Sequence, residues 1–179
     1  FVKKYLHHPG EYYAIILFSI LGMMLMAASA ELLTAYISLE LLSFSLYILV
    51  SMARDDPKSN EAGVKYILLG AFASALLLYG ISMVYGALGT TTFAGIGLAM
   101  GSGLDASPNL LIGIVLILAG LGFKVAAVPF HMWTPDFYEG APLPVTAYLA
   151  VGSKAAAFAL ILRLFATAFM QSIEEWHLI

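Results

Sequence analysis

Five stretches of this 179-residue chain are apolar and long enough to cross a lipid bilayer. They cover residues 12–30, 32–52, 63–88, 110–131 and 145–169, and each approaches or exceeds the ~20 residues that a transmembrane helix requires. Because lipid offers the backbone no hydrogen-bond partners, such segments cross the membrane as α-helices. The sequence therefore predicts an all-α integral membrane protein, in which residues 1–179 form a single membrane domain of five transmembrane helices.

The composition agrees with a membrane protein and excludes several other classes. Hydrophobic residues make up 61% of the chain and charged residues only 11%, which is far from the composition of a soluble domain. The net charge of −3 says little by itself, because the charges are segregated by position along the chain, and we expect no nucleic-acid partner for such a membrane protein. The chain has no cysteine, so it can form no disulfide, no thiolate metal site and no cysteine-bound iron–sulfur cluster. We therefore expect any redox centre to belong to another chain.

The basic residues outside the spans predict the orientation in the membrane. They are Lys3, Lys4, Arg54 and Lys58, and all lie on one side if the five spans alternate. We expect that side to be cytoplasmic, because the opposite loops contain Glu31 and Asp105 but no lysine or arginine. The connection 132–144 returns to the cytoplasmic side with Asp136 and Glu139 and no basic residue, which the charge rule does not explain.

The N-terminal segment imitates a secretory signal, since Lys3 and Lys4 precede an apolar run that ends at Ala28-Ser29-Ala30. That run exceeds the ~7–15 residues of a signal's apolar region, and a second span follows directly, so a transmembrane helix is the better interpretation. The chain begins with Phe1, and we expect it to be part of a longer protein.

Three ionisable residues lie deep inside apolar runs. Glu40 lies in the second run, at a depth of about 12 Å at the helical rise, and Lys124 and Lys154 occupy the centres of the last two runs. A charge at such a depth costs roughly 2.5–3.5 kcal/mol on insertion scales and usually marks an ion path. We therefore interpret these three residues as proton-handling groups, with the hydroxyls of Ser43 and Ser45 available to hold water near Glu40.

A pair formed by Glu40 and Lys124 would act as a switch. Burial disfavours the charged form of a lysine, and a nearby carboxylate favours it, so opening or closing the pair changes how readily each partner keeps its proton. Two structural alternatives stay open. Glu40 can be a neutral side chain that only bonds to neighbouring helices, and the lysines can belong to static ion pairs.

Other polar residues of the spans are more ambiguous. Lys65 lies near the start of its run and Arg163 near the end of its own, so both side chains can reach the membrane interface. His131 closes the fourth run beside Pro129 and Trp133, and its role is either to cap and pack the helix or to shuttle protons.

Four prolines follow Lys124, and they cannot lie in one continuous helix. They are Pro129, Pro135, Pro142 and Pro144. We therefore predict a proline-broken fourth helix, with the break at Pro129 and Pro135, followed by a short helix. Broken helices within a membrane are tolerated where they are buried in protein or line water, and transporters use them at ion sites.

Three motifs also resemble a known family. They are Glu-Leu-Leu-Ser-Phe-Ser-Leu-Tyr at 40–47, Phe123-Lys124 leading to Pro-Phe-His-Met-Trp-Thr-Pro-Asp-Phe-Tyr-Glu-Gly-Ala-Pro at 129–142, and Ser153-Lys154. In these motifs the chain resembles subunit N of respiratory complex I, the proton-pumping NADH:quinone oxidoreductase. The Tyr-Glu-Gly-Ala-Pro ending resembles subunit N more than its sister subunits L and M, and the resemblance runs from end to end.

The resemblance implies the first of two inverted five-helix repeats, each with a broken helix. It matches Glu40 and Lys124 to the family's glutamate–lysine pair, Lys154 to its central relay lysine, and Lys65 to a further lysine. The second repeat and its terminal lysine are missing from this sequence. Leu143 stands where the family usually has threonine, which is a minor departure.

The function implied by the resemblance is proton translocation by a non-redox subunit of NADH:quinone oxidoreductase. Partner subunits would bind NADH, FMN, iron–sulfur clusters and quinone, and this chain would contact lipid and other membrane-arm subunits. The expected location is a bacterial inner membrane or an equivalent energy-transducing membrane. The alternatives are a subunit of a cation/proton antiporter or membrane-bound hydrogenase, and a structural membrane-arm protein whose buried charges only fix helix register.

Overall fold

A computed structural model of the chain describes residues 9–102 and 107–170. Lys3, Lys4 and Asp105, which entered the prediction of orientation, lie outside the described residues.

The described residues form five helical spans, as predicted. Four are single helices, namely α2 (Pro9–Ala28), α3 (Leu32–Val50), α4 (Pro57–Leu88) and α6 (Pro108–Val125). The fifth, Leu143–Thr167, consists of α8 (Leu143–Tyr148), a π-helical turn η1 (Leu149–Ser153) and α9 (Lys154–Thr167). Two short helices, α5 (Phe93–Gly101) and α7 (Thr134–Gly140), lie in the connections. The predicted all-α membrane fold is thereby confirmed.

Two helix ends differ from the predicted boundaries. Helix α4 begins at Pro57 and not at residue 63, because the Asp56 side chain accepts a hydrogen bond of 3.0 Å from the Lys58 N–H and proline suits the first helical position. Helix α6 ends at Val125 and not at residue 131, although the sequence stays apolar beyond that point. Hydropathy locates the membrane-crossing run, whereas caps decide where the helix begins and ends.

The prolines occupy the ends of helices. Pro129 lies in the turn that follows α6, Pro135 lies in the first turn of α7, and Pro142 directly precedes α8. The predicted break in the fourth helix is therefore present, but Pro135 begins a helix and does not interrupt one.

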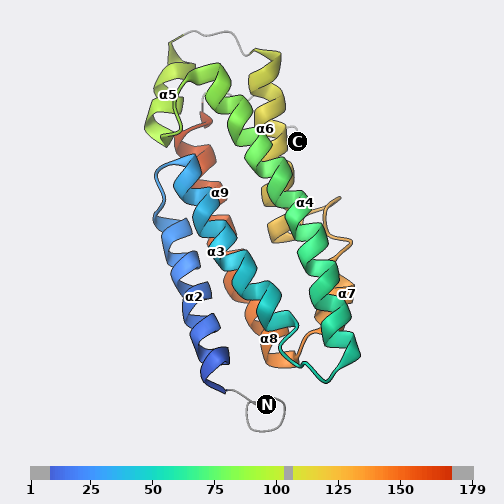
Figure 1. Cartoon of the computed structure of the whole chain (residues 1–179). Coiled ribbons are helices and arrows are strands. Elements are labelled where there is room, and N and C mark those ends of the chain that lie inside the picture. Colours follow the sequence, from blue (N-terminus) through green and yellow to red (C-terminus); the bar gives the residue numbers. More distant parts are fainter. Residues whose placement is uncertain (1–8, 103–106, 171–179) are drawn as a thin grey trace.

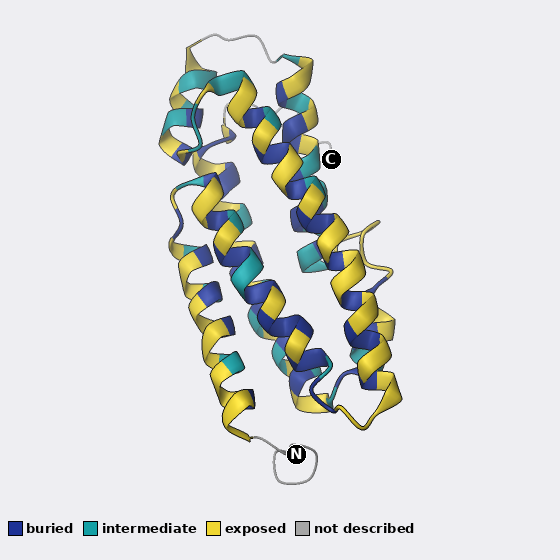
Figure 2. Ribbon diagram, in the orientation of Figure 1, coloured by how far each residue is buried: buried dark blue, intermediate teal, exposed yellow. Residues whose placement is uncertain are grey.

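The five spans run side by side and alternate in direction (Figure 1). Helix α2 packs against α3 and α9, while α4 packs against α6 and α7. The side chains between the helices are buried, and exposed residues follow the outer faces of α2 and α4 (Figure 2). These outer faces are apolar, as expected of surfaces that meet lipid. They include Leu17, Met24, Leu68 and Phe72.

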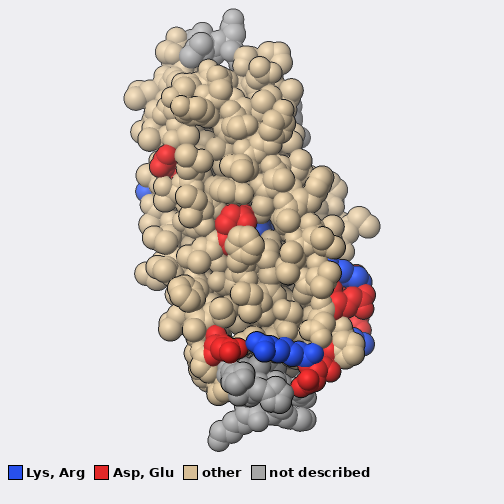
Figure 3. All heavy atoms as spheres, viewed as in Figure 1, with Lys and Arg blue, Asp and Glu red and all other residues tan. Residues whose placement is uncertain are grey.

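Ion pairs gather at the end of the molecule where α4 begins and where α7 lies (Figure 3). Lys58 pairs with Glu139 at 3.4 Å, and Lys65 pairs with Asp136 at 3.2 Å and Glu61 at 2.7 Å. The acids of connection 132–144 thus neutralise basic residues of α4 at the same end. This explains why a connection on the predicted cytoplasmic side is acidic.

Small residues let the backbones of α4 and α6 approach closely. A Cβ atom added at Gly80 would lie 2.7 Å from the Gly113 carbonyl oxygen, and one added at Gly113 would lie 3.0 Å from the Gly80 carbonyl oxygen. Both values are near or below the shortest separations that real Cβ atoms adopt. Such close approach is a usual way for membrane helices to associate, because dispersion contacts replace the missing hydrophobic effect.

We expect Gly80→Ala to lower thermal stability, since the added methyl group must push two backbones apart at a cost of roughly 1–3 kcal/mol. Gly86 provides a matched control on the same helix, because its added Cβ atom would meet nothing within 4 Å. Gly86→Ala should be neutral or stabilising through its better helix propensity. Unfolding temperatures of the two purified variants test this, and equal temperatures would contradict the proposed close contact.

Candidate functional site

One face of α3 carries the polar residues of the site. Glu40, Ser43 and Tyr47 are spaced three and four residues apart, so they lie in one stripe along the helix. Ser43 and Tyr47 are buried, and Glu40 is half-buried. The stripe therefore presents a carboxylate, a hydroxyl group and a phenol to the neighbouring helices α4 and α6.

The Glu40 carboxylate bonds to a serine of α4. Its Oε1 atom accepts a hydrogen bond of 2.5 Å from the Ser74 hydroxyl, and Ser74 is itself 5% exposed. This length is at the short end of the range for hydrogen bonds between a hydroxyl group and a carboxyl oxygen. Nothing in the sequence singled out Ser74, because a lone serine in an apolar run more often only packs helices together.

The Lys124 ammonium bonds to α3. Its Nζ atom donates to Ser43 Oγ at 2.6 Å, and Ser43 Oγ in turn donates to the Leu39 carbonyl at 2.6 Å. The same nitrogen lies 5.7 Å from the centroid of the Tyr47 ring, within the range of a cation–π contact. The predicted buried lysine is therefore satisfied by a hydroxyl group and an aromatic face.

The termination of α6 at Val125, earlier than the apolar run predicts, positions Lys124. Ala126 adopts the left-handed conformation with φ 58°, and the next N–H, that of Ala127, donates to the Gly122 carbonyl at 2.9 Å. Lys124 is in the last turn of α6, where the negative end of the helix dipole favours a cation. The end of the helix at Val125 therefore stabilises the positive charge of Lys124.

Glu40 and Lys124, both within the described residues, lie in one cluster but form no ion pair at the 4.0 Å limit. The sequence predicted a direct pair. Instead, each charged group bonds to a serine of a neighbouring helix. Sequence spacing cannot give this outcome, because it depends on the rotation of α4 and α6 about their axes.

A small cavity joins Lys124 to the last span. It is lined by Ser43, Lys124 and Ser153 together with apolar side chains, and its volume is ≈ 10 Å³. One water molecule needs roughly 10–15 Å³ and several polar partners, so this cavity is at the lower limit for a bound water. Lys154 directly follows Ser153 in the chain but does not line the cavity, so the cavity reaches the last span without reaching the second lysine.

Lys154 follows the π-helical turn and faces α7. Its Nζ atom lies 5.3 Å from the centroid of the Tyr138 ring. The Tyr138 hydroxyl is buried without a hydrogen-bond partner among the described residues. Single π-helical turns are frequent at functional sites. The depth of Lys154 was predictable from the sequence, whereas the π-helical turn and the aromatic neighbour Tyr138 were not.

Two other predicted residues lie apart from this cluster. Lys65 is 44% exposed and bonds to Glu61 and Asp136 on the charged end, which agrees with a side chain that reaches the interface. His131 is exposed in the turn before α7, and its backbone carbonyl accepts from the Thr134 N–H at 3.0 Å. In this conformation neither residue contacts Glu40, Lys124 or Lys154.

An aromatic stack packs the segment between α6 and α7 against α4. The Tyr66 ring stacks on Trp133 at 5.3 Å with an interplanar angle of 13°, and it lies 4.8 Å from the Phe137 ring. The Trp133 Nε1–H donates to the Phe123 carbonyl at 3.1 Å, which satisfies a backbone group in the last turn of α6. Trp133 therefore joins α4, the end of α6 and the start of α7.

Five membrane-crossing helices, one of which is broken beside a buried lysine, define an antiporter-like membrane domain. The chain belongs to the family described as NADH:quinone oxidoreductase/Mrp antiporter, whose transmembrane sequence model matches residues 29–179. It is thus a multi-pass membrane protein, as predicted. Among the described residues, no group of three metal-ligating side chains occurs.

The predicted resemblance to subunit N is confirmed. The chain is 49% identical over 179 residues to NADH-quinone oxidoreductase subunit N of Desulforamulus reducens, which covers 100% of this chain and 37% of that protein. A chain of respiratory complex I from Thermus thermophilus superposes with a TM-score of 0.76 at 42% identity, over 86% of this chain and 34% of that one. This chain therefore spans about a third of the length of such relatives.

The antiporter alternative has the same fold. A chain of the Mrp complex from Dietzia sp. superposes with a TM-score of 0.77 at 25% identity, over 87% of this chain and 29% of that one. Since the two TM-scores are nearly equal, shape does not separate the alternatives. The higher sequence identity favours subunit N.

We expect Ala126→Gly to stabilise the break beside Lys124 by roughly 0.5–1 kcal/mol, because glycine adopts a positive φ without the steric cost that alanine bears. Ala127→Gly is the matched control, since Ala127 is exposed and lies outside the left-handed region. There the added freedom of the unfolded chain should reduce stability. Shifts of opposite sign in the unfolding temperature support this account, and shifts of equal sign contradict it.

Proposed function

We propose that this chain is part of a proton-translocating membrane subunit of an NADH:quinone oxidoreductase, in which Glu40, Lys124 and Lys154 handle the protons. The observation that carries the proposal is the Lys124 ammonium, which lies at the end of a broken helix and bonds to Ser43, one turn from Glu40 on α3. The identity of 49% with a relative named as subunit N supports the same function.

Lys124 is suited to bind and release a proton within the membrane. When the Glu40 carboxylate lies near it, the ammonium form is favoured, and when the carboxylate withdraws, burial favours release of the proton. The cavity lined by Ser43, Lys124 and Ser153 lies beside this nitrogen and reaches the span that carries Lys154. In this proposal a water molecule in the cavity takes the proton from Lys124, and further rearrangement of the last span brings it to Lys154.

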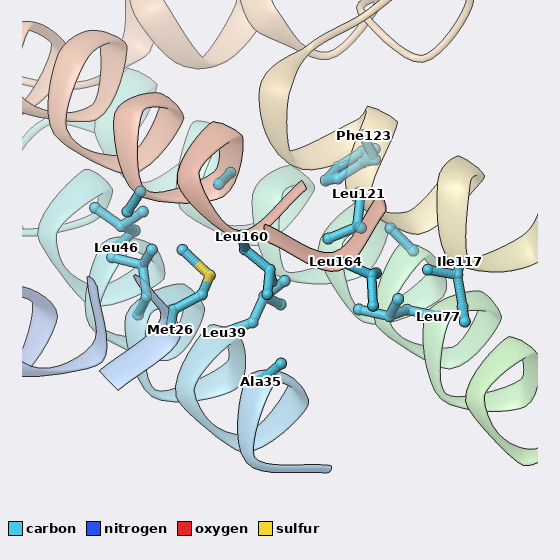
Figure 4. Close-up of a cluster of buried hydrophobic side chains, with 14 of the residues drawn as sticks. Met26, Ala35, Leu39, Leu46, Leu77, Ile117, Leu121, Phe123, Leu160 and Leu164 are labelled. Atoms are coloured by element: carbon cyan, nitrogen blue, oxygen red, sulfur yellow. The ribbon is translucent and has the colours of Figure 1, made fainter. Parts of the chain in front are cut away.

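An apolar layer limits the proton path on one side. Leu39, Leu77, Ile117, Leu121, Leu160 and Leu164 come from four helices (Figure 4). On each of the four helices, these residues lie between the polar residues and the end of the molecule that carries α5. An apolar constriction stays dry and blocks ions. We therefore propose that Lys124 exchanges protons with the charged end of the molecule and not with the α5 end.

We assign the redox chemistry to partner subunits, because a chain without cysteine cannot bind an iron–sulfur cluster through thiolates. In this proposal NADH, FMN, iron–sulfur clusters and quinone bind to other subunits. The other membrane-arm subunits adjoin this chain, and charge changes that pass along them move the Glu40–Lys124 pair.

Replacement of Lys124 tests the central role. In the assembled complex in liposomes, we expect Lys124→Met to lower NADH-driven proton pumping by about tenfold or more, because the variant removes the group that binds the proton. Lys58→Met is the control, since Lys58 is a surface residue that pairs with Glu139. An unchanged ratio of protons to NADH in Lys124→Met would eliminate this role.

A double substitution separates proton transfer from a purely structural role. If the charges only fixed helix register, Glu40→Leu combined with Lys124→Met would retain function, as buried ion pairs can often be replaced by apolar residues. We expect the double variant to assemble but to lose pumping. Normal pumping by this variant would support the structural alternative. Separately, a sodium requirement for pumping by the unmodified complex would support a cation/proton antiporter.

A further inference from the structure

Two buried serines each bond to one of the two charged groups. Ser74 on α4 donates to Glu40, and Ser43 on α3 accepts from Lys124 on α6. Their exposed fractions are 5% and 1%, so neither hydroxyl exchanges its partner for bulk water. The carboxylate and the ammonium are therefore bound to separate partners, although both flank the same turn of α3.

The roles of the two hydroxyl groups differ from that of an ordinary membrane serine. Ser45, on the same helix, donates to its own Leu41 carbonyl at 2.8 Å, and among the described residues it bonds to neither Glu40 nor Lys124, although the sequence placed its hydroxyl group near Glu40. Ser43 also donates within its helix, to Leu39, which leaves its oxygen lone pairs to accept from Lys124. Ser74 donates to the carboxylate of another helix. One serine therefore accepts from a cation while the other donates to an anion.

We propose that Ser43 and Ser74 are positioning residues that hold the Glu40–Lys124 pair open. This inference rests on the proton-translocating function proposed above. Glu40 and Ser43 are neighbours on one face of α3, so the flexible Lys124 stem can transfer its nitrogen from the hydroxyl to the carboxylate by side-chain rotation alone. The bonds to the serines compete with the ion pair and set the balance between its open and closed states.

The open state, with both serine bonds, and the closed ion pair are close in free energy, because each state is held by hydrogen bonds to charged groups. Hydrogen bonds to ionised groups are stronger than neutral ones, and each serine makes one of them. Without Ser43, the Lys124 ammonium loses its hydrogen bond to a side-chain hydroxyl group, and without Ser74 the Glu40 carboxylate loses a hydrogen-bond donor. In either case Glu40 and Lys124 become the best remaining partners for each other, and the closed pair retains its proton.

Alanine substitutions test this in the assembled complex. We expect Ser43→Ala and Ser74→Ala each to slow NADH-driven proton pumping by roughly tenfold, which corresponds to the loss of one charged hydrogen bond. Ser45→Ala should pump as the wild type does. Ser43→Thr and Ser74→Thr, which keep the hydroxyl, should restore most of the rate.

A structure of the complex with Ser43→Ala and Ser74→Ala provides the decisive readout. We expect the distance from Lys124 Nζ to a Glu40 carboxylate oxygen to fall below the 4.0 Å limit of an ion pair. If the double variant does not assemble, the structure of Ser74→Ala alone decides the question. A pair that stays open, or an equal loss of pumping in Ser45→Ala, would overturn the inference.

The two proposals fail in different ways. If Lys124→Met abolishes pumping while Ser43→Ala and Ser74→Ala pump normally, the serines do not position the pair, and the proposed function stands. If Lys124→Met pumps normally, the proposed function itself fails, whatever the serine variants do.

Discussion

The end of α6 at Val125 is the constraint on which the rest of the site depends. A helix that continued through the apolar run would carry Lys124 in its interior, without the free carbonyls of a helix end. The left-handed Ala126 and the bond from Trp133 to the Phe123 carbonyl close the helix instead. The lysine then lies at the negative end of the α6 dipole and reaches Ser43, so the backbone geometry and the charge stabilise each other.

The sequence predicted the features that follow from hydropathy and charge, and it missed those that depend on helix rotation. The spans and the depth of Glu40, Lys124 and Lys154 follow from counting residues along apolar runs. The bond of Ser74 to Glu40 requires α4 to turn one particular face toward α3, and no periodic pattern specifies that face. The exposed position of Lys65 likewise depends on where α7 lies, since its partner Asp136 is distant in the sequence.

Two kinds of contact attach α7 to α4, and they differ in strength. The ion pairs of Lys58 and Lys65 are exposed, and such pairs contribute only about 0–1 kcal/mol each. The stack of Tyr66 on Trp133 is buried, and aromatic pairs add roughly 0.5–1.5 kcal/mol beyond their buried area. The aromatic contact therefore determines where α7 lies, while the ion pairs mainly match charges at the membrane surface.

The π-helical turn between α8 and α9 determines the direction in which Lys154 points. Each residue inserted into a helix advances everything beyond it by about 100° around the axis. The turn Leu149–Ser153 ends directly before Lys154, so the phase of α9 is offset from that of α8. In a regular α-helix the same lysine would point to a different side of the span and away from the Tyr138 ring. The direction in which Lys154 points around the helix axis therefore depends on the backbone hydrogen bonds of the preceding turn as well as on its position in the sequence.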